Sequence, residues 1–172
     1  MSYKHFAHFI AIFNCALKHK KSSFTFALRR KKILDFLDFL IGREYIAGYT
    51  MPSGIDRNNL PNKLGPMRSS YYCPVTVVLR VDKQVSGIKV GSTAGNRRSM
   101  RKEEVKVQAR RLTLGLGGET LIFLSDKFRG FCTVAELANC GGGGILVCRI
   151  KLRGGFSDAP IEASTRPHFS GL

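Results

Sequence analysis

The stretch that decides the fold is Gly130-Phe131-Cys132-Thr133, continued to Cys140-Gly141-Gly142-Gly143-Gly144-Ile145. Thr133 and Glu136 have the spacing of a capping box, in which each side chain bonds a free backbone N–H at the start of a helix. The helix is expected to end at residues 139–141, because glycine readily adopts the left-handed conformation that ends helices. The stretch therefore predicts a glycine turn at Gly130, a short capped helix, four bare glycines and a closing strand over 145–150.

The charge of the chain indicates a polyanionic partner. Its 172 residues include 28 Lys and Arg against 12 Asp and Glu, a formal net charge of +16. A folded domain with this surplus repels itself, which favours a nucleic-acid partner over a protein that is basic for solubility alone. At 44% hydrophobic residues, the chain has the apolar content of a folded domain. We therefore expect a nucleic-acid phosphate to approach the backbone that the four glycines leave bare.

Apolar periodicity predicts an α+β protein made of two small subdomains. The N-terminal subdomain, 1–91, is expected to contain helices at 4–17 and 33–41, the second ended by Gly42, and a loop insertion at 51–70. The C-terminal subdomain, 92–150, is expected to be mainly β with one short helix, and 151–172 is an extension. Further strands are predicted at 24–28, 44–49, 74–81, 85–90 and 120–124. The strands 74–81 and 85–90 are expected to pair as an antiparallel hairpin.

Basic clusters supply the candidate binding residues. Arg29, Arg30, Lys31 and Lys32 stand at the start of the second helix, where cations oppose the helix dipole and need another reason to be present. A phosphate contact is one reason, and a solvated face is the alternative. A second basic stretch runs over 97–111. Phe128, between two cations, either stacks on a base or fills the seam between the subdomains.

Other classes of site are not indicated. The five cysteines form no CxxC pair, which argues for reduced thiols in an intracellular compartment, and we expect no metal and no cofactor. No apolar run is long enough to cross a bilayer, so no membrane partner is expected. The first seventeen residues resemble an organellar targeting segment, but their spacing favours a core helix.

The glycine motifs do not indicate an enzyme. The sequence Leu114-Gly115-Leu116-Gly117-Gly118 lacks the third glycine of a dinucleotide fingerprint, and the run at 141–144 lacks the Gly-Lys-Ser/Thr ending of a P-loop. No Ser/His/Asp order, paired-carboxylate site or HExxH motif is present. We expect no catalytic activity and no small-molecule substrate. A small nucleotide-binding enzyme is the alternative that saturable nucleotide binding would favour.

From Gly130 to Ile150 the chain resembles, without gaps, the C-terminal motif of the small-subunit ribosomal protein eight family. The resemblance covers residues 5–50 and 75–150. Upstream, Glu44-Tyr45-Ile46 stands where the family has Gly-Phe-Ile, and the 114–117 turn stands at the family's Gly-Leu-Gly. The resemblance implies a structural constituent of the ribosome that binds small-subunit ribosomal RNA of the central domain. It also implies contacts with neighbouring small-subunit ribosomal proteins and a part in subunit assembly.

The resemblance further implies where RNA is contacted. The family's Ser-Thr-Ser-Lys-Gly contact loop corresponds to 126–130, where Arg129 keeps the cation and Gly130 keeps the turn. Ser125, just before this loop, substitutes for the family's hydroxyls if the loop is shifted by one residue. The family's Gly-Gly-Glu is Gly143-Gly144-Ile145 here, without the acid. The candidate RNA-binding residues are Arg29, Arg30, Lys31, Lys32, Arg97, Arg98, Arg101, Ser125, Lys127, Phe128, Arg129, Gly130, Gly141, Gly142, Gly143 and Gly144.

These departures from the family, the insertion and the extension together favour a mitochondrial ribosome over a plastid or bacterial one. A free RNA-binding assembly or regulatory factor on the same fold is the alternative function.

Overall fold

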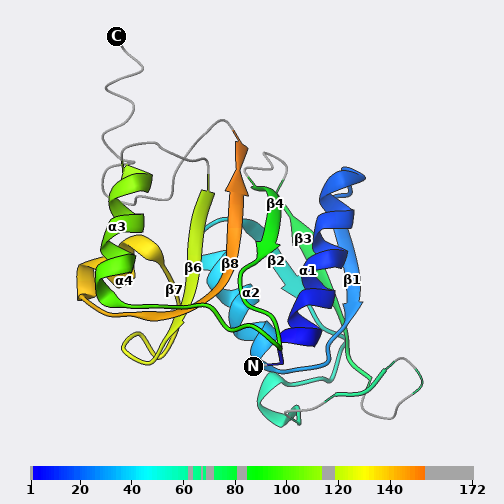
Figure 1. The fold of residues 1–172 in the computed structure, drawn as a ribbon. Helices are drawn as coiled ribbons and strands as arrows, with labels where there is room; N and C mark the ends of the chain where they lie inside the picture. The colour runs from blue at the N-terminus through cyan, green and yellow to red at the C-terminus, as the bar shows by residue number, and fades with distance from the viewer. Residues whose placement is uncertain are drawn as a thin grey trace. The chain divides into compact units, whose positions relative to one another are not determined.

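The computed structural model of the chain describes residues 2–61, 64–66, 68, 72–80, 85–113 and 119–153. These residues form four α-helices and two antiparallel sheets, in two compact units, Met1–Gln84 and Val85–Leu172 (Figure 1). The predicted α+β class is confirmed. The predicted turn at 114–118 and most of the predicted extension, 154–172, lie outside the described residues.

The first unit packs two helices on a three-stranded sheet. The helices are α1 (Tyr3–Lys18) and α2 (Lys32–Gly42), and the strands β1 (Ser23–Ala27), β2 (Ile46–Thr50) and β3 (Pro74–Leu79) lie in the order β1-β3-β2. Phe9 of α1 joins the layers, with its ring centroid 4.7 Å from that of Phe26 on β1 and 6.3 Å from that of Phe36 on α2. These three phenylalanines are buried and form part of the core of this unit.

Helix α2 ends at Gly42 as predicted, but this glycine does not take the left-handed conformation. Gly42 is the last helical residue, and Glu44 takes the left-handed conformation at φ 61°. The Tyr45 N–H then donates to the Leu40 carbonyl at 2.9 Å, which satisfies one of the free carbonyls of the last turn. Lys20 ends α1 in the same way at φ 54°. The chain thus ends both helices of this unit without a glycine at the left-handed position.

The loop after β2 is attached to α2 by an arginine. It contains a short 3-10 helix, η1 (Arg57–Asn59), and the Arg57 guanidinium donates to the carboxylates of Asp35 and Asp38 on α2. Tyr49 on β2 donates its hydroxyl to Asp38 at 2.9 Å. Part of the predicted insertion is therefore held against the second helix.

The predicted hairpin of 74–81 with 85–90 is wrong. β3 pairs with β1 and β2 in the first unit, whereas β4 (Val85–Val90) pairs with β8 (Gly144–Leu152) in the second. Both pairings are antiparallel, and each strand finds buried partners there, which a two-stranded hairpin would not provide. β4 consequently belongs to the second unit, although the sequence pattern grouped it with the first.

The second unit is built around β8. The remaining elements are β5 (Ser99–Met100), α3 (Lys102–Thr113), β6 (Glu119–Ser125), β7 (Gly130–Thr133) and α4 (Val134–Cys140). The strand order is β4-β8-β6-β7, with β5 also paired to β8. Val105 of α3 and Leu137 of α4 share a core with Phe123, Cys132 and Leu146 of the sheet, and the two helices lie together in Figure 1.

The expectation of one short helix in this part is wrong, because α3 is a second and longer one. Its buried face is narrow: Val105 is fully buried, and Ala109 and Leu112 are only partly buried against the core. Glu103 and Glu104 in its first turn and Arg110 and Arg111 in its last turn favour the helix dipole. Charge placement therefore supports this helix in addition to apolar burial.

Candidate nucleic-acid interface

The capping box predicted at Thr133 is confirmed. The Glu136 N–H donates to Thr133 Oγ1 at 3.3 Å, and the Thr133 N–H donates to Glu136 Oε1 at 3.2 Å. At the other end of α4, Gly141 is left-handed at φ 70°, and the Gly142 N–H donates to the Leu137 carbonyl at 3.2 Å. The helix therefore begins and ends where the sequence predicts.

The glycine turn predicted at Gly130 is wrong. Gly130 is the first residue of β7 and pairs with Ser125 on β6. The reversal lies just before it, where the Arg129 N–H donates to the Asp126 carbonyl at 3.2 Å and Arg129 is left-handed at φ 53°. Phe128 is in this loop and is 38% exposed. The candidate contact loop is thus the tip of the β6–β7 hairpin.

The hairpin loop and the glycine run enclose one surface hollow. Its volume is about 360 Å³. Ser125 Oγ donates to the Gly143 carbonyl at 3.2 Å, and Lys127 Nζ donates to the Cys140 carbonyl at 3.0 Å, so the two walls are bonded to each other. The lining residues are Leu124, Ser125, Asp126, Lys127, Gly142, Gly143, Gly144 and Ile145. The structure therefore brings two sequence-predicted groups, separated along the chain, into one site.

Two of the four glycines are required by the protein's own backbone. A Cβ on Gly143 would lie 2.6 Å from the Met100 carbonyl oxygen, and one on Gly144 would lie 2.9 Å from the Leu124 carbonyl oxygen. Separations below 3.0 Å from backbone atoms force the chain to shift. Internal packing is therefore sufficient to explain these two glycines, and the expected approach of a phosphate to the run stays a prediction.

The basic residues before α3 lie beside the same strand. The Leu146 N–H donates to the Arg98 carbonyl at 2.8 Å, and Met100 pairs with Gly144. The Arg101 N–H donates to Glu104 Oε2 at 2.7 Å, which caps the start of α3. The side chains of Arg97, Arg98 and Arg101 are exposed. These three candidates therefore share the edge of β8 with the glycine run.

The other predicted candidates, Arg29, Arg30, Lys31 and Lys32, belong to the first unit. The Nε donors of Arg29 and Arg30 are buried and have no hydrogen-bond acceptor among the described residues. Lys31 occupies the N-cap of α2 without a side-chain cap, and Lys32 lies 3.8 Å from Asp35. This cluster therefore contains donors that the described part of the chain leaves unsatisfied.

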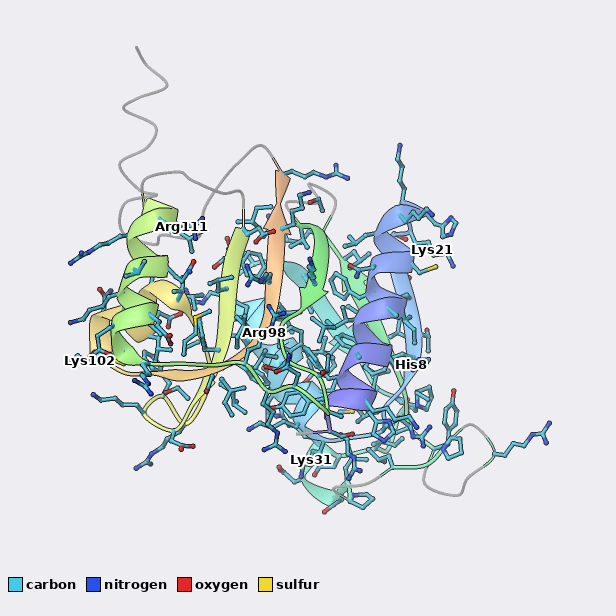
Figure 2. The ribbon with its side chains drawn as sticks, in the orientation of Figure 1. His8, Lys21, Lys31, Arg98, Lys102 and Arg111 are labelled. Carbon is cyan, nitrogen blue, oxygen red and sulfur yellow. The ribbon has the colours of Figure 1, made fainter. Side chains whose placement is uncertain are left out.

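The candidate residues chosen from the sequence did not include the exposed cations of α3, although these lie within the basic stretch noted at 97–111. Figure 2 shows Lys102 and Arg111 at the two ends of α3, and Lys106 and Arg110 are also exposed. The signal that would have found them is the spacing of Val105, Ala109 and Leu112, which defines a buried helical face and leaves the basic residues outside.

No candidate metal centre is found in the part of the chain that the structure describes. No group of three or more His, Cys, Asp or Glu side chains is arranged there to hold an ion. None of the five cysteines, all within the described residues, forms a disulfide, and burial raises the pKa of the Cys148 thiol. Among the described helices, none is long and apolar enough to span a bilayer.

No protein-family model matches the chain, and no curated protein matches it. The resemblance to the ribosomal protein eight family therefore rests on the residues quoted above.

Proposed function

We propose that this protein is a structural constituent of the small ribosomal subunit that binds ribosomal RNA and has no catalytic activity. The observation that supports this most directly is the hollow between the β6–β7 loop and the glycine run, on a chain with a net charge of +16. Lys127 lines the hollow together with Gly142, Gly143 and Gly144, and Arg129 is exposed two residues further along the same loop. Cationic side chains with accessible backbone suit contacts to phosphate and sugar.

The local geometry also agrees with the family resemblance at a position that could have contradicted it. Glu44 stands where the family has glycine, and Glu44 is left-handed at φ 61°. A left-handed residue after a helix is the position at which glycine is most favoured. The resemblance and the backbone conformation therefore point to the same helix end.

In this proposal each group has a role in holding RNA. Arg97, Arg98, Arg101, Lys127 and Arg129 neutralise phosphates, Ser125 and the glycine run approach the sugar edge of a groove, and Phe128 stacks on an exposed base. The resemblance extends this to the central domain of small-subunit ribosomal RNA, with neighbouring small-subunit ribosomal proteins as further partners. The proposed location is the mitochondrial ribosome.

The test combines Lys127→Gln with Arg129→Gln in the full chain. Each lost phosphate contact lowers the slope of log affinity against log salt by about 0.7 to 0.9, so the pair should lower it by roughly 1.4 to 1.8. Lys18→Gln with Lys21→Gln, an equal loss of charge in the first unit, is the matched control. If the slope of log affinity against log salt is unchanged in the Lys127/Arg129 variant, the hollow is not the RNA-binding site.

Sedimentation separates a ribosomal constituent from a free factor. A constituent stays with small subunits purified from mitochondria through a high-salt wash. A protein that washes off completely would be an assembly or regulatory factor, and the structural role would be abandoned.

A further inference from the structure

The first two turns of α1 lie beside the start of α2. The ring centroid of Phe6 is 5.0 Å from that of Phe36 on α2, and Phe9 packs on Phe26 near the end of β1. His5 is in the first of these turns, and the charges of Arg29 and Arg30, in the segment that joins β1 to α2, act on it. In Figure 2, His8 and Lys31 lie toward the lower end of α1 as drawn, and Lys21 lies toward its upper end.

The groups around His5 are cationic. Burial lowers the pKa of His5 first, and the charges of Arg29, Arg30, Lys4 and His8 lower it further. These charges come from α1 itself and from the segment before α2, and no carboxylate of the described residues counteracts them at His5. The structure thus gathers cations from two separate parts of the sequence.

The described acids of the first unit are engaged elsewhere. Asp35 and Asp38 accept from Arg57, Glu44 lies 3.9 Å from Arg80, and Asp56 caps η1. Only Asp35 also reaches the cluster, through Lys32. Like charges held together without counter-charges destabilise a fold unless an anion from outside offsets them.

Hydrogen bonding at this place is also incomplete. Arg29 Nε and Arg30 Nε have no acceptor within the described residues. Helix α1 has no side-chain cap and no acid in its first turn, and Lys31 caps α2 without a side-chain bond. Arginine donors and uncapped helix starts are groups that phosphate oxygens satisfy.

We propose that Lys4, His5 and His8 of α1 join Arg29, Arg30 and Lys31 in one phosphate-binding surface, the α1–α2 basic surface, which holds the sugar-phosphate backbone of RNA. This inference deepens the proposed function and rests on it for the identity of the polyanion. It adds a contact in the first unit that is separate in the chain from the hollow of the second, and it assigns binding roles to Lys4, His5 and His8.

Binding at this surface is linked to protonation. A phosphate beside His5 offsets the repulsion from the neighbouring cations, so the bound protein takes up a proton that the free protein lacks near neutral pH. Affinity should therefore rise as the pH falls toward and below about 6.5, the ordinary value for histidine.

The first test compares two double variants that each lose two positive charges. One changes the proposed surface, and the other changes the opposite end of α1. Lys4→Gln with Lys31→Gln should weaken binding of the full chain to a short fluorescein-labelled RNA stem-loop by about tenfold and lower the salt slope by roughly 1.4 to 1.8. The control, Lys18→Gln with Lys21→Gln, changes exposed residues at the far end of α1. An equal loss of RNA affinity in the two variants would contradict the proposal that this surface binds RNA. Thermal unfolding of both variants verifies that they are folded.

The second test measures protons directly. Titration calorimetry of the same stem-loop at about pH 6.5, in two buffers of different ionisation enthalpy, should show proton uptake by the wild type. His5→Gln should abolish the uptake and flatten the dependence of affinity on pH. Equal uptake by the variant, or none by the wild type, would contradict the linkage.

The outcomes separate this inference from the proposed function. If the protein washes off small subunits but stem-loop binding still depends on Lys4 and Lys31, the proposed ribosomal role is wrong. The proposal that the α1–α2 basic surface binds RNA is then still supported. If the protein stays with subunits but the Lys4/Lys31 variant binds the stem-loop like its control, only the proposed α1–α2 basic surface is rejected, and the ribosomal role is kept. If poly-glutamate binds as tightly as RNA and with the same dependence, the occupant is an acidic protein segment and the RNA assignment is overturned.

Discussion

Gly143 is constrained by a single oxygen atom. A Cβ at this position would lie 2.6 Å from the Met100 carbonyl, which is part of β5 and unable to rotate away. We predict that Gly143→Ala lowers the free energy of unfolding by about 1–3 kcal/mol, because the overlap forces the backbone to shift. Gly130→Ala is the matched control, since nothing lies within 4 Å of its Cβ. Urea denaturation of both variants measures the difference, and equal stabilities would contradict the steric explanation.

At Glu44 the situation is reversed, because a residue with a Cβ occupies a left-handed backbone conformation that favours glycine. Glu44→Gly should raise the free energy of unfolding by about 1 kcal/mol, since glycine reaches a left-handed φ without the steric cost of a Cβ. The ion pair that it removes, with Arg80 at 3.9 Å, is exposed and contributes little. Glu44→Ala deletes the same charge but keeps the Cβ, so it should give no gain. Thermal unfolding distinguishes them, and an equal gain in both would refute the backbone argument.

Local chemistry is what made some residues predictable. The capping box of Thr133 and Glu136 and the stop at Gly141 each depend on bonds within a few positions, so the sequence contains the whole interaction. The clash at Gly143 depends on Met100, more than forty positions away, and could not be inferred from the glycine run. The same limit hid His5, whose proximity to Arg29 requires α1 to lie against α2.

The sequence predicted the positions of the strands better than it predicted which strands pair with one another. Each of β3 and β4 was found close to its observed range, but their neighbours in the sheets, β1, β2 and β8, are distant in sequence. Alternating apolar residues specify that a strand is half-buried and do not specify what covers it. Helix α3 was missed for a related reason, since its one fully buried residue, Val105, is too weak a periodic signal among so many charges.

The Arg57 contacts give the loop after β2 a testable role. Arg57→Gln should speed hydrogen exchange of residues 55–60 by about tenfold, because the loop loses both carboxylate partners on α2. The groups are partly exposed, so solvent screening should keep the change in global stability below about 1 kcal/mol. Arg57→Lys keeps the charge without the two-pronged donor and should give an intermediate rate. Exchange at the wild-type rate in Arg57→Gln would mean that other contacts hold the loop.

The net charge affects the whole chain. With a formal charge of +16, the folded protein repels itself more strongly than the expanded unfolded chain does. Raising sodium chloride from low to physiological concentration should therefore raise the midpoint of thermal unfolding by about 2–5 °C, since the screening length shortens. Replacing the exposed residues Lys18, Lys21, Lys106 and Arg110 with glutamine should reduce this response. A midpoint that falls with salt would show that ion pairs outweigh the repulsion.

The place of β8 in its sheet has a consequence for how the chain acquires structure during its synthesis. The first unit has all its strands once β3 has been made, so it can fold while translation continues. β4, β5 and β6 all pair with β8, which is the last strand in the described part of the chain. Until β8 has been made, these three strands lack their common neighbour and present open hydrogen-bonding edges. A chain that stopped translating after α4 would therefore contain every strand of the first sheet and lack the central strand of the second.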